Sequence, residues 1–231
     1  VPTTAGTGTE VTKNAVISSY SPPFKKSLRS DRMVPRIVVV DPELQVSIPA
    51  ATTAYTGMDA ITQLIESYVS VRAAPIPQAL CLQGLALAVP SIVRAVKEGG
   101  DRDAREKMAH AALLSGMALA NSGLGMAHGV AAALGIHARV AHGLACAVML
   151  PAALRVNREV READIARLGE VMCGRTFGST SSAAAAAAEK VEELCSATGI
   201  PRKLSEIGVK RDDLPAIVKS SYGNSMSGNP R

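Results

Sequence analysis

Aromatic residues are scarce in this chain. They make up 3% of its 231 residues, with no tryptophan and two phenylalanines, although 47% of the residues are hydrophobic. A chain of this length can bury a sizeable core, and that core must be built from aliphatic side chains. Such a composition suits close packing of helix against helix.

Cysteine pairs are also missing. The four cysteines stand at irregular positions and none forms a C-x-x-C motif, so a disulfide framework is not expected. We expect buried thiols in a reducing compartment, which indicates a cytoplasmic protein.

Neither a long basic run nor a long apolar run is present. The net charge is +5, and the basic residues are spread along the chain apart from residues 25–36, which gives nucleic-acid binding little support. No apolar stretch reaches the roughly 18–20 residues of a membrane span, and no signal-peptide pattern is found. The sequence begins with Val1, so we expect it to be a fragment or a processed product.

The first 48 residues have an α/β character. Residues 11–19 are rich in β-branched side chains and predict a strand that ends at Pro22 and Pro23. Residues 36–40 (RIVVV) predict a second, short apolar strand.

From residue 49 onward, apolar residues recur at helical spacing. The predicted helices are 51–69, 79–97 with a break at Pro90, 103–120 capped by Asp103, 125–134, 143–154, 161–173, 181–198, and one or two helices within 203–219. The sequence therefore predicts a mainly α protein with a domain boundary near residues 46–50.

Three polar residues share one face of the first predicted helix. Gln63 and Glu66 follow Asp59 at i+4 and i+7, and burying such a set requires partners. Further along, His128 and His142 are each flanked by glycine and small residues, which leaves room at an imidazole. An aspartate with two histidines can bind Fe²⁺ or Zn²⁺. On spacing alone, however, each histidine is more often a packing residue.

Several ordered motifs resemble those of iron-containing (group III) alcohol dehydrogenases. The matching segments are 2–12 (PTTAGTGTEVT, against PTTAGTGSEVT in the family), 41–44 (DPEL), 57–60 (GMDA), 124–129 (LGMAHG), 142–151 (HGLACAVMLP) and 199–201 (GIP). The resemblance runs in order over nearly the whole chain, which makes it far more specific than any single histidine.

The resemblance implies a dehydroquinate-synthase-like fold. Residues 1–48 would be the end of an N-terminal α/β domain that binds NAD or NADP, and residues 49–231 an all-helical metal and substrate domain. The chain would be the C-terminal two-thirds of a typical member, starting after the glycine-rich phosphate-binding motif. The resemblance also implies a small alcohol or aldehyde substrate and a homo-oligomer, a dimer or larger. The composition predicts no nucleic-acid or membrane partner.

Asp59, His128 and His142 fall on the family's metal-ligand positions, and the two histidines would act in catalysis. The family's fourth ligand is usually a histidine, and here that position is Gln63, whose carbonyl oxygen is a weaker ligand. A second departure is Ala132, where many members have a histidine assigned to proton transfer.

Other positions match more loosely. Cofactor contacts are expected from hydroxyls in the first loop and from a lysine after it, namely Thr3, Thr4, Thr7, Thr12, and Lys25 or Lys26, with Lys26 preferred. Glu66 would orient a metal ligand or pair with an arginine. His137 could replace the missing relay histidine or be a loop residue, and His110 is expected to be a packing or surface residue.

Three interpretations of function remain open. The first is an NAD(P)-dependent, metal-assisted alcohol dehydrogenase. The second is a related reductase, such as a maleylacetate reductase or a glycerol dehydrogenase. The third is a truncated, non-catalytic relative, which Gln63 and Ala132 favour slightly.

Overall fold

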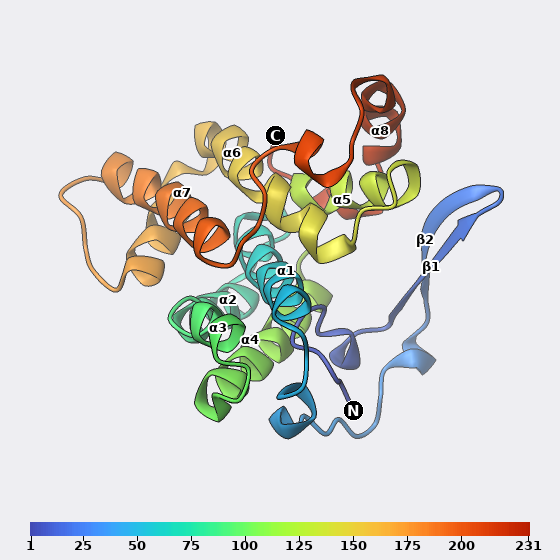
Figure 1. The fold of residues 1–231 in the computed structure, drawn as a ribbon. Helices are drawn as coiled ribbons and strands as arrows, with labels where there is room; N and C mark the ends of the chain where they lie inside the picture. The colour runs from blue at the N-terminus through green and yellow to red at the C-terminus, as the bar shows by residue number, and fades with distance from the viewer.

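The computed structural model describes the backbone of residues 1–231 and every side chain except those of Pro23 and Asn224. The molecule is mainly helical, as the sequence predicts. Figure 1 shows the helices gathered into one body, from which the hairpin of β1 (Asn14–Tyr20) and β2 (Pro23–Arg29) projects.

The helical body begins with α1 (Ala50–Val69) and contains the chain's other α-helices. These are α2 (Pro75–Ala88), α3 (Ile92–Lys97), α4 (Arg102–Asn121), α5 (Met126–His137), α6 (His142–Cys173), α7 (Thr180–Ala197) and α8 (Leu214–Ser221). Three short 3₁₀ helices precede α1: η1 (Thr9–Val11), η2 (Asp31–Met33) and η3 (Pro42–Gln45). Three more follow α7: η4 (Leu204–Ile207) and η5 (Arg211–Asp213) before α8, and η6 (Asn224–Gly228) after it.

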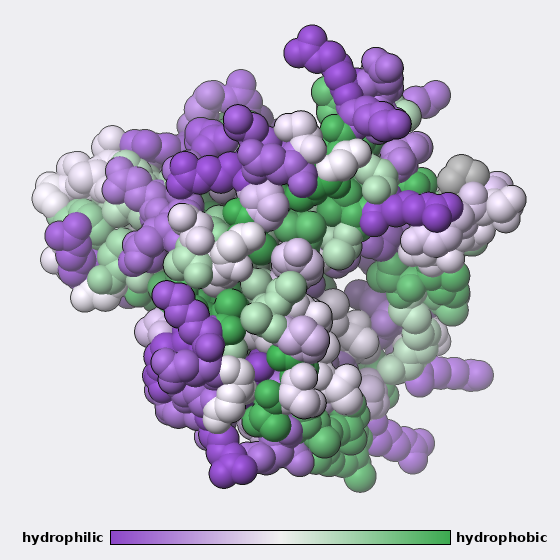
Figure 2. Space-filling model, in the orientation of Figure 1, coloured by the Kyte–Doolittle hydropathy of each residue, from purple (hydrophilic) through white to green (hydrophobic). Residues whose placement is uncertain are grey.

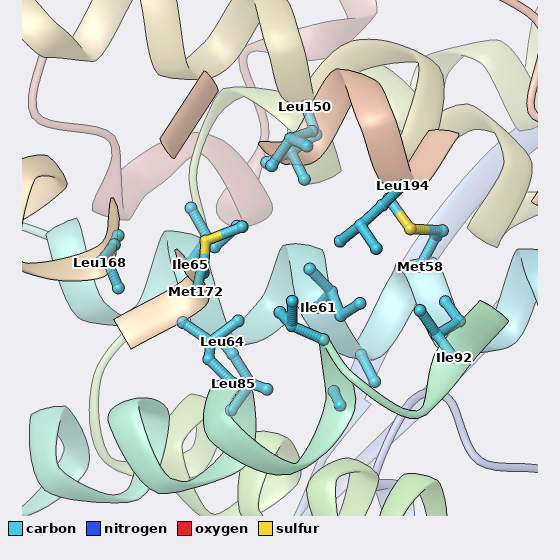
Figure 3. Close-up of a cluster of buried hydrophobic side chains, with 14 of the residues drawn as sticks. Met58, Ile61, Leu64, Ile65, Leu85, Ile92, Leu150, Leu168, Met172 and Leu194 are labelled. Carbon is cyan, nitrogen blue, oxygen red and sulfur yellow. The ribbon is translucent and has the colours of Figure 1, made fainter. Parts of the chain in front are cut away.

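Helix α1 lies in the middle of the core. Ala54, Met58, Ile61 and Ile65 recur at helical spacing and are each at most 1% exposed. Helices α2, α3, α4 and α6 pack around α1. Figure 3 shows aliphatic side chains from several helices meeting there, including Leu85, Ile92, Leu150 and Leu194. Because α1 is buried on all sides from residue 57 onward, its polar residues lie in the interior.

The helix boundaries follow the sequence prediction with corrections at the starts of α2 and α4. Helix α2 begins at Pro75 and not at residue 79. Pro90 separates α2 from α3, as predicted. The N-cap of α4 is Asp101 and not Asp103, because the Asp101 side chain accepts a hydrogen bond from the Ala104 amide at 3.0 Å. The predicted break between helices 143–154 and 161–173 is confirmed at Arg161, where a non-helical backbone (φ −136°, ψ 31°) divides α6 into two helices that meet at a kink.

The N-terminal segment departs further from the prediction. The strand predicted over residues 11–19 is confirmed from Asn14, and it pairs antiparallel with β2, which the sequence did not reveal. The sequence of β2 is polar and opens with a proline, which a strand tolerates at its first residue.

The strand predicted over residues 36–40 is wrong. This segment is irregular, and Ile37 is 82% exposed. A strand needs a neighbour for its backbone groups, and β1 and β2 pair with each other in the described structure. Other large apolar side chains of this region, such as Val16 and Leu28, are also exposed, and Figure 2 shows apolar surface on the side of the hairpin.

The last predicted helix, 203–219, resolves into η4, η5 and α8. In the described chain no single helix is both long and apolar enough to cross a membrane. The helices α4 and α5 pass those criteria only as a pair, and they are bent by 100°.

Candidate metal centre

The buried face of α1 carries the polar residues that the sequence singles out. Asp59, Gln63 and Glu66 are each at most 3% exposed. The start of α5 contributes His128, which is 2% exposed, and the first residue of α6 contributes His142. The structure thus brings together residues that lie more than eighty positions apart in the sequence.

Glu66 fixes the start of α5. Its carboxylate accepts hydrogen bonds from the backbone amides of Gly125 (3.0 Å), Ala127 (2.6 Å) and His128 (3.3 Å). A carboxylate at a helix N-terminus satisfies amides that have no partner within the helix and complements the helix dipole. Glu66 therefore anchors the residue that carries the first imidazole.

The same carboxylate also orients the ring of His128. Glu66 Oε2 lies 2.7 Å from His128 Nδ1, so Nδ1 donates and Nε2 is directed toward Asp59, with a distance of 3.3 Å from Nε2 to Oδ1. The partners of Glu66 in the structure are His128 and the backbone amides at the start of α5. Its expected role in orienting a metal ligand stays a prediction.

A close approach of α6 to α1 positions His142. A Cβ atom on Gly143 would lie 2.2 Å from the carbonyl oxygen of Tyr55 and 3.3 Å from Asp59 Cβ, so only glycine lets the start of α6 come this near. His142 Nε2 lies 3.9 Å from Asp59 Oδ1. On the other side of the ring, Lys25 Nζ lies 3.2 Å from His142 Nδ1.

Cys146 lies in one side-chain cluster with Asp59, His128 and His142. The sequence prediction missed it. One ligand atom from each of Asp59, His128, His142 and Cys146 lies within 4.8 Å of the others. The signal was available in the sequence, because Cys146 follows His142 by four residues and shares its helix face.

The donor set fits a divalent cation. Asp59 Oδ1 and His128 Nε2 are buried atoms without a hydrogen-bond partner among the described residues, and leaving such groups unsatisfied costs free energy. Carboxylate, imidazole and thiolate are all ligands of Fe²⁺ or Zn²⁺. Asp59 and His128 are closed off at 3% side-chain exposure, whereas His142 is 34% exposed, so the cluster is open on the His142 side.

The ionisation of the cluster is strongly coupled. Burial raises the pKa of Asp59 and lowers that of His128. The contact with His128 and the charge of His142 nevertheless lower the pKa of Asp59 overall. Contacts with Cys146, Asp59 and Glu66 raise the pKa of His128 well above its usual value. Desolvation, with the positive charges of His128 and Lys25, lowers the pKa of His142 to about 4 despite the opposing charge of Asp59.

Gln63 has a different environment. Its side-chain oxygen accepts a hydrogen bond from Ser115 Oγ of α4 at 3.3 Å. Gln63 is therefore buried beside the cluster with a protein partner for its oxygen, and its role as a metal ligand stays a prediction.

The predicted cofactor loop is docked on α4. Gly8 has a left-handed backbone (φ 57°), and a Cβ atom there would lie 2.4 Å from the Ala112 carbonyl oxygen. Thr3, Thr4 and Thr7 are exposed on this loop.

Thr12 and Lys26 are the two remaining predicted cofactor residues. Thr12 is 3% exposed, and its hydroxyl donates to the Thr9 carbonyl and accepts from the Asn14 amide. Lys26 is exposed and lies over the Phe24 ring, whereas its neighbour Lys25 reaches His142. The cofactor contacts stay predictions.

The two other histidines lie away from the cluster. His137 ends α5, about 13 Å along the helix from His128, and its Nε2 contacts Ser220 Oγ. His110 is exposed on α4, as expected, beside a surface hollow of about 440 Å³. Ala132 is not replaced by His137 at the cluster.

Comparison with known proteins gives two family matches. The model described as "Fe-containing alcohol dehydrogenase family, C-terminal" matches residues 53–231, and "Iron-containing alcohol dehydrogenase" matches residues 1–42. Together they cover most of the chain, in the order expected from the motifs.

Individual relatives agree with these matches. The chain is 39% identical to 1,3-propanediol dehydrogenase of Klebsiella pneumoniae, over 100% of this chain and 60% of that protein. It is 34% identical to NAD-dependent methanol dehydrogenase of Bacillus methanolicus, over 100% and 61%. The crystal structure of a 1,3-propanediol oxidoreductase superposes with a TM-score of 0.95 at 38% identity, covering 99% of this chain and 60% of that one. The chain thus spans about 60% of the length of these relatives.

Proposed function

Because the chain belongs to the iron-containing alcohol dehydrogenase family, we propose that the protein interconverts a small alcohol and its aldehyde or ketone with NAD or NADP, at a site that holds Fe²⁺ or Zn²⁺. The observation that carries this proposal is the buried convergence of Asp59 Oδ1 with the Nε2 atoms of His128 and His142. The activity is assigned to the whole protein, since the chain spans about 60% of its relatives' length.

Asp59, His128 and His142 would hold the metal. Asp59 Oδ1 and His128 Nε2 are buried without a hydrogen-bond partner among the described residues, and His142 Nε2 lies 3.9 Å from Asp59 Oδ1, which supports this assignment. Gln63 is the fourth candidate by its position in the family pattern. When bound, the divalent cation supplies Lewis-acid polarisation of the substrate oxygen, and the nicotinamide takes or returns the hydride.

The chain's own residues prepare the site. Asp59 brings negative charge into the interior, and Glu66 holds His128 in the tautomer that presents Nε2 to the cluster. The partial exposure of His142 provides the side from which a small substrate would enter. Lys25, in contact with His142 Nδ1, holds that ring toward Asp59.

The division into two domains and the cofactor contacts belong to the same proposal. Residues 1–48 would complete an α/β domain that binds NAD(P), with exposed hydroxyls on Thr3, Thr4 and Thr7 and the Lys26 amine available to it. Thr12 would contribute indirectly, by shaping the loop. The free thiols suit a reducing cytoplasm, and a homo-oligomer is proposed from the family pattern alone.

An enzyme assay tests the proposal. The whole purified protein, loaded with Fe²⁺ or Zn²⁺, is assayed for reduction of NAD⁺ or NADP⁺ with methanol, ethanol and 1,3-propanediol, and for oxidation of the reduced cofactors with maleylacetate. We expect turnover of the alcohols that is lost in Asp59→Asn and kept in Asp103→Asn, a control on the exposed surface of α4. Turnover of maleylacetate alone would favour the related reductase. If none of these substrates is turned over, the protein is better described as a non-catalytic relative.

A further inference from the structure

Cys146 is the member of the cluster that the family pattern does not account for. It lies one helical turn after His142 on α6 and is 0% exposed. We propose that Cys146, and not Gln63, is the fourth protein ligand, so that the protein presents a carboxylate, two imidazoles and a thiolate, a donor set typical of zinc. The inference rests on the proposed metal site and specifies its composition.

The spacing of the donor atoms supports this assignment. In a tetrahedral zinc site with bonds of about 2.0–2.3 Å, neighbouring ligand atoms lie about 3.3–3.8 Å apart. The structure places His128 Nε2 3.3 Å from Asp59 Oδ1, His142 Nε2 3.9 Å from Asp59 Oδ1, and Cys146 Sγ 3.8 Å from His142 Nε2. Three of the six donor-atom pairs thus lie near the separations that one small cation requires, and the other three lie within 4.8 Å.

The unpartnered atoms point the same way. Asp59 Oδ1 and His128 Nε2 are buried and lack a hydrogen-bond partner among the described residues, so the cluster contains polar groups that a cation would satisfy. Cys146 Sγ lies within 4.8 Å of both atoms. A cysteine in an apolar core would not need such neighbours.

Gln63 is the weaker candidate for the fourth position. Its amide oxygen already accepts from Ser115 Oγ, and that hydrogen bond would be lost if the oxygen turned to a metal. An amide oxygen is also a harder and weaker donor than a thiolate, which suits zinc well. Binding through Cys146 releases the thiol proton to solvent as the sulfur–metal bond forms.

Cobalt substitution tests the inference independently of activity. The purified protein is stripped with a chelator and loaded with Co²⁺, and its near-ultraviolet spectrum is recorded for sulfur-to-cobalt charge transfer. Zn²⁺ affinity is measured by competition with a chromogenic chelator. The variants are Cys146→Ala, the near-isosteric Cys146→Ser, and Gln63→Ala. The control is Cys195→Ala, which removes a buried thiol of α7.

We expect the charge-transfer band in the wild type, in Gln63→Ala and in Cys195→Ala, and its loss in both Cys146 variants. Changes around a ligand cost about 10–100-fold in metal affinity, so removal of Cys146 should weaken Zn²⁺ binding by at least about tenfold. A wild type that binds Co²⁺ without the band overturns the inference and leaves the proposed function standing. A wild type that binds no metal overturns both. The band in the wild type reports a thiolate ligand, and its persistence in a folded Cys146→Ser protein would also overturn the inference.

Discussion

At the scale of single residues, the site depends on one buried carboxylate that does not itself face the cluster's centre. Glu66 accepts hydrogen bonds from three backbone amides at the start of α5 and from Nδ1 of His128. These contacts determine both where α5 begins and which nitrogen of His128 faces Asp59. Glu66 is accordingly a positioning residue in the proposed site.

Glu66→Gln should weaken Zn²⁺ binding by about 10–100-fold. Glutamine keeps the size of the side chain but replaces an acceptor oxygen by an amide nitrogen, so one of the four donors loses its partner. The measurement is chelator competition, with Glu106→Gln on the exposed surface of α4 as control. Equal affinities for the two variants would show that Glu66 does not orient His128.

Gly143→Ala should damage both stability and metal binding. The new methyl group would meet the Tyr55 carbonyl oxygen at 2.2 Å, and such overpacking costs about 1–3 kcal/mol while it pushes His142 away from Asp59. Thermal denaturation and zinc titration measure the two effects. Gly135→Ala on α5, where the nearest atom is 3.7 Å away, should leave the affinity unchanged. A Gly143→Ala protein with normal stability and affinity would contradict the close approach of the helices.

Thiol labelling at pH 8 should distinguish the cysteines by their burial. Burial raises the pKa of Cys81 and of Cys195 to about 12, so both stay protonated at pH 8, and only the thiolate is nucleophilic. Cys173 is half-buried. Mass spectrometry after brief treatment with an alkylating reagent at pH 8 should find Cys173 labelled first, and Cys81 and Cys195 only after unfolding. Rapid labelling of Cys81 in the native protein would contradict its burial.

At the scale of elements, sequence patterning predicts the helices well and the strands poorly. Helix α1 follows from the spacing of Met58, Ile61 and Ile65, which is a local property, and Pro90 ends α2 for a local reason. The segment 36–40 looks like a strand but remains irregular, because strand formation depends on a partner elsewhere in the chain. Pattern alone could not supply that information.

The site shows the same division between local and distant information. The face shared by Asp59 and Glu66 follows from helical periodicity, and the motif resemblance pointed to His128 and His142. Which atoms meet could not be predicted, because the contacts of Glu66 with α5 and of Lys25 with His142 join segments far apart in the sequence. Cys146 was missed although its i+4 spacing from His142 is local.

Packing between the N-terminal loop and α4 offers a test at this scale. A Cβ atom on Gly116 would lie 2.1 Å from the Gly8 carbonyl oxygen, so Gly116→Ala should dislodge the loop at a cost of about 1–3 kcal/mol. Hydrogen exchange over residues 5–12 should become faster, while α1 keeps its protection. Gly100→Ala is the control, since nothing lies within 4 Å of that position. Unchanged exchange in Gly116→Ala would place the loop elsewhere.

At the scale of the whole molecule, the interior helix α1 joins the hydrophobic core to the candidate site. One set of its side chains packs against α2, α3, α4 and α6, and another set meets the histidines of α5 and α6. Because the polar set is buried within the same core, a bound cation would stabilise the folded chain by mass action, by about 2.7 kcal/mol at a free concentration one hundred times its Kd.

Metal content tests the central claim most directly. The protein, purified without chelator and then equilibrated with Zn²⁺ or, anaerobically, with Fe²⁺, is analysed by inductively coupled plasma mass spectrometry beside His128→Ala and the surface control His110→Ala. The proposed site predicts about one metal ion per chain in the wild type and in His110→Ala, and almost none in His128→Ala. A wild type without bound metal, or a His128→Ala variant that retains it in full, would contradict the account.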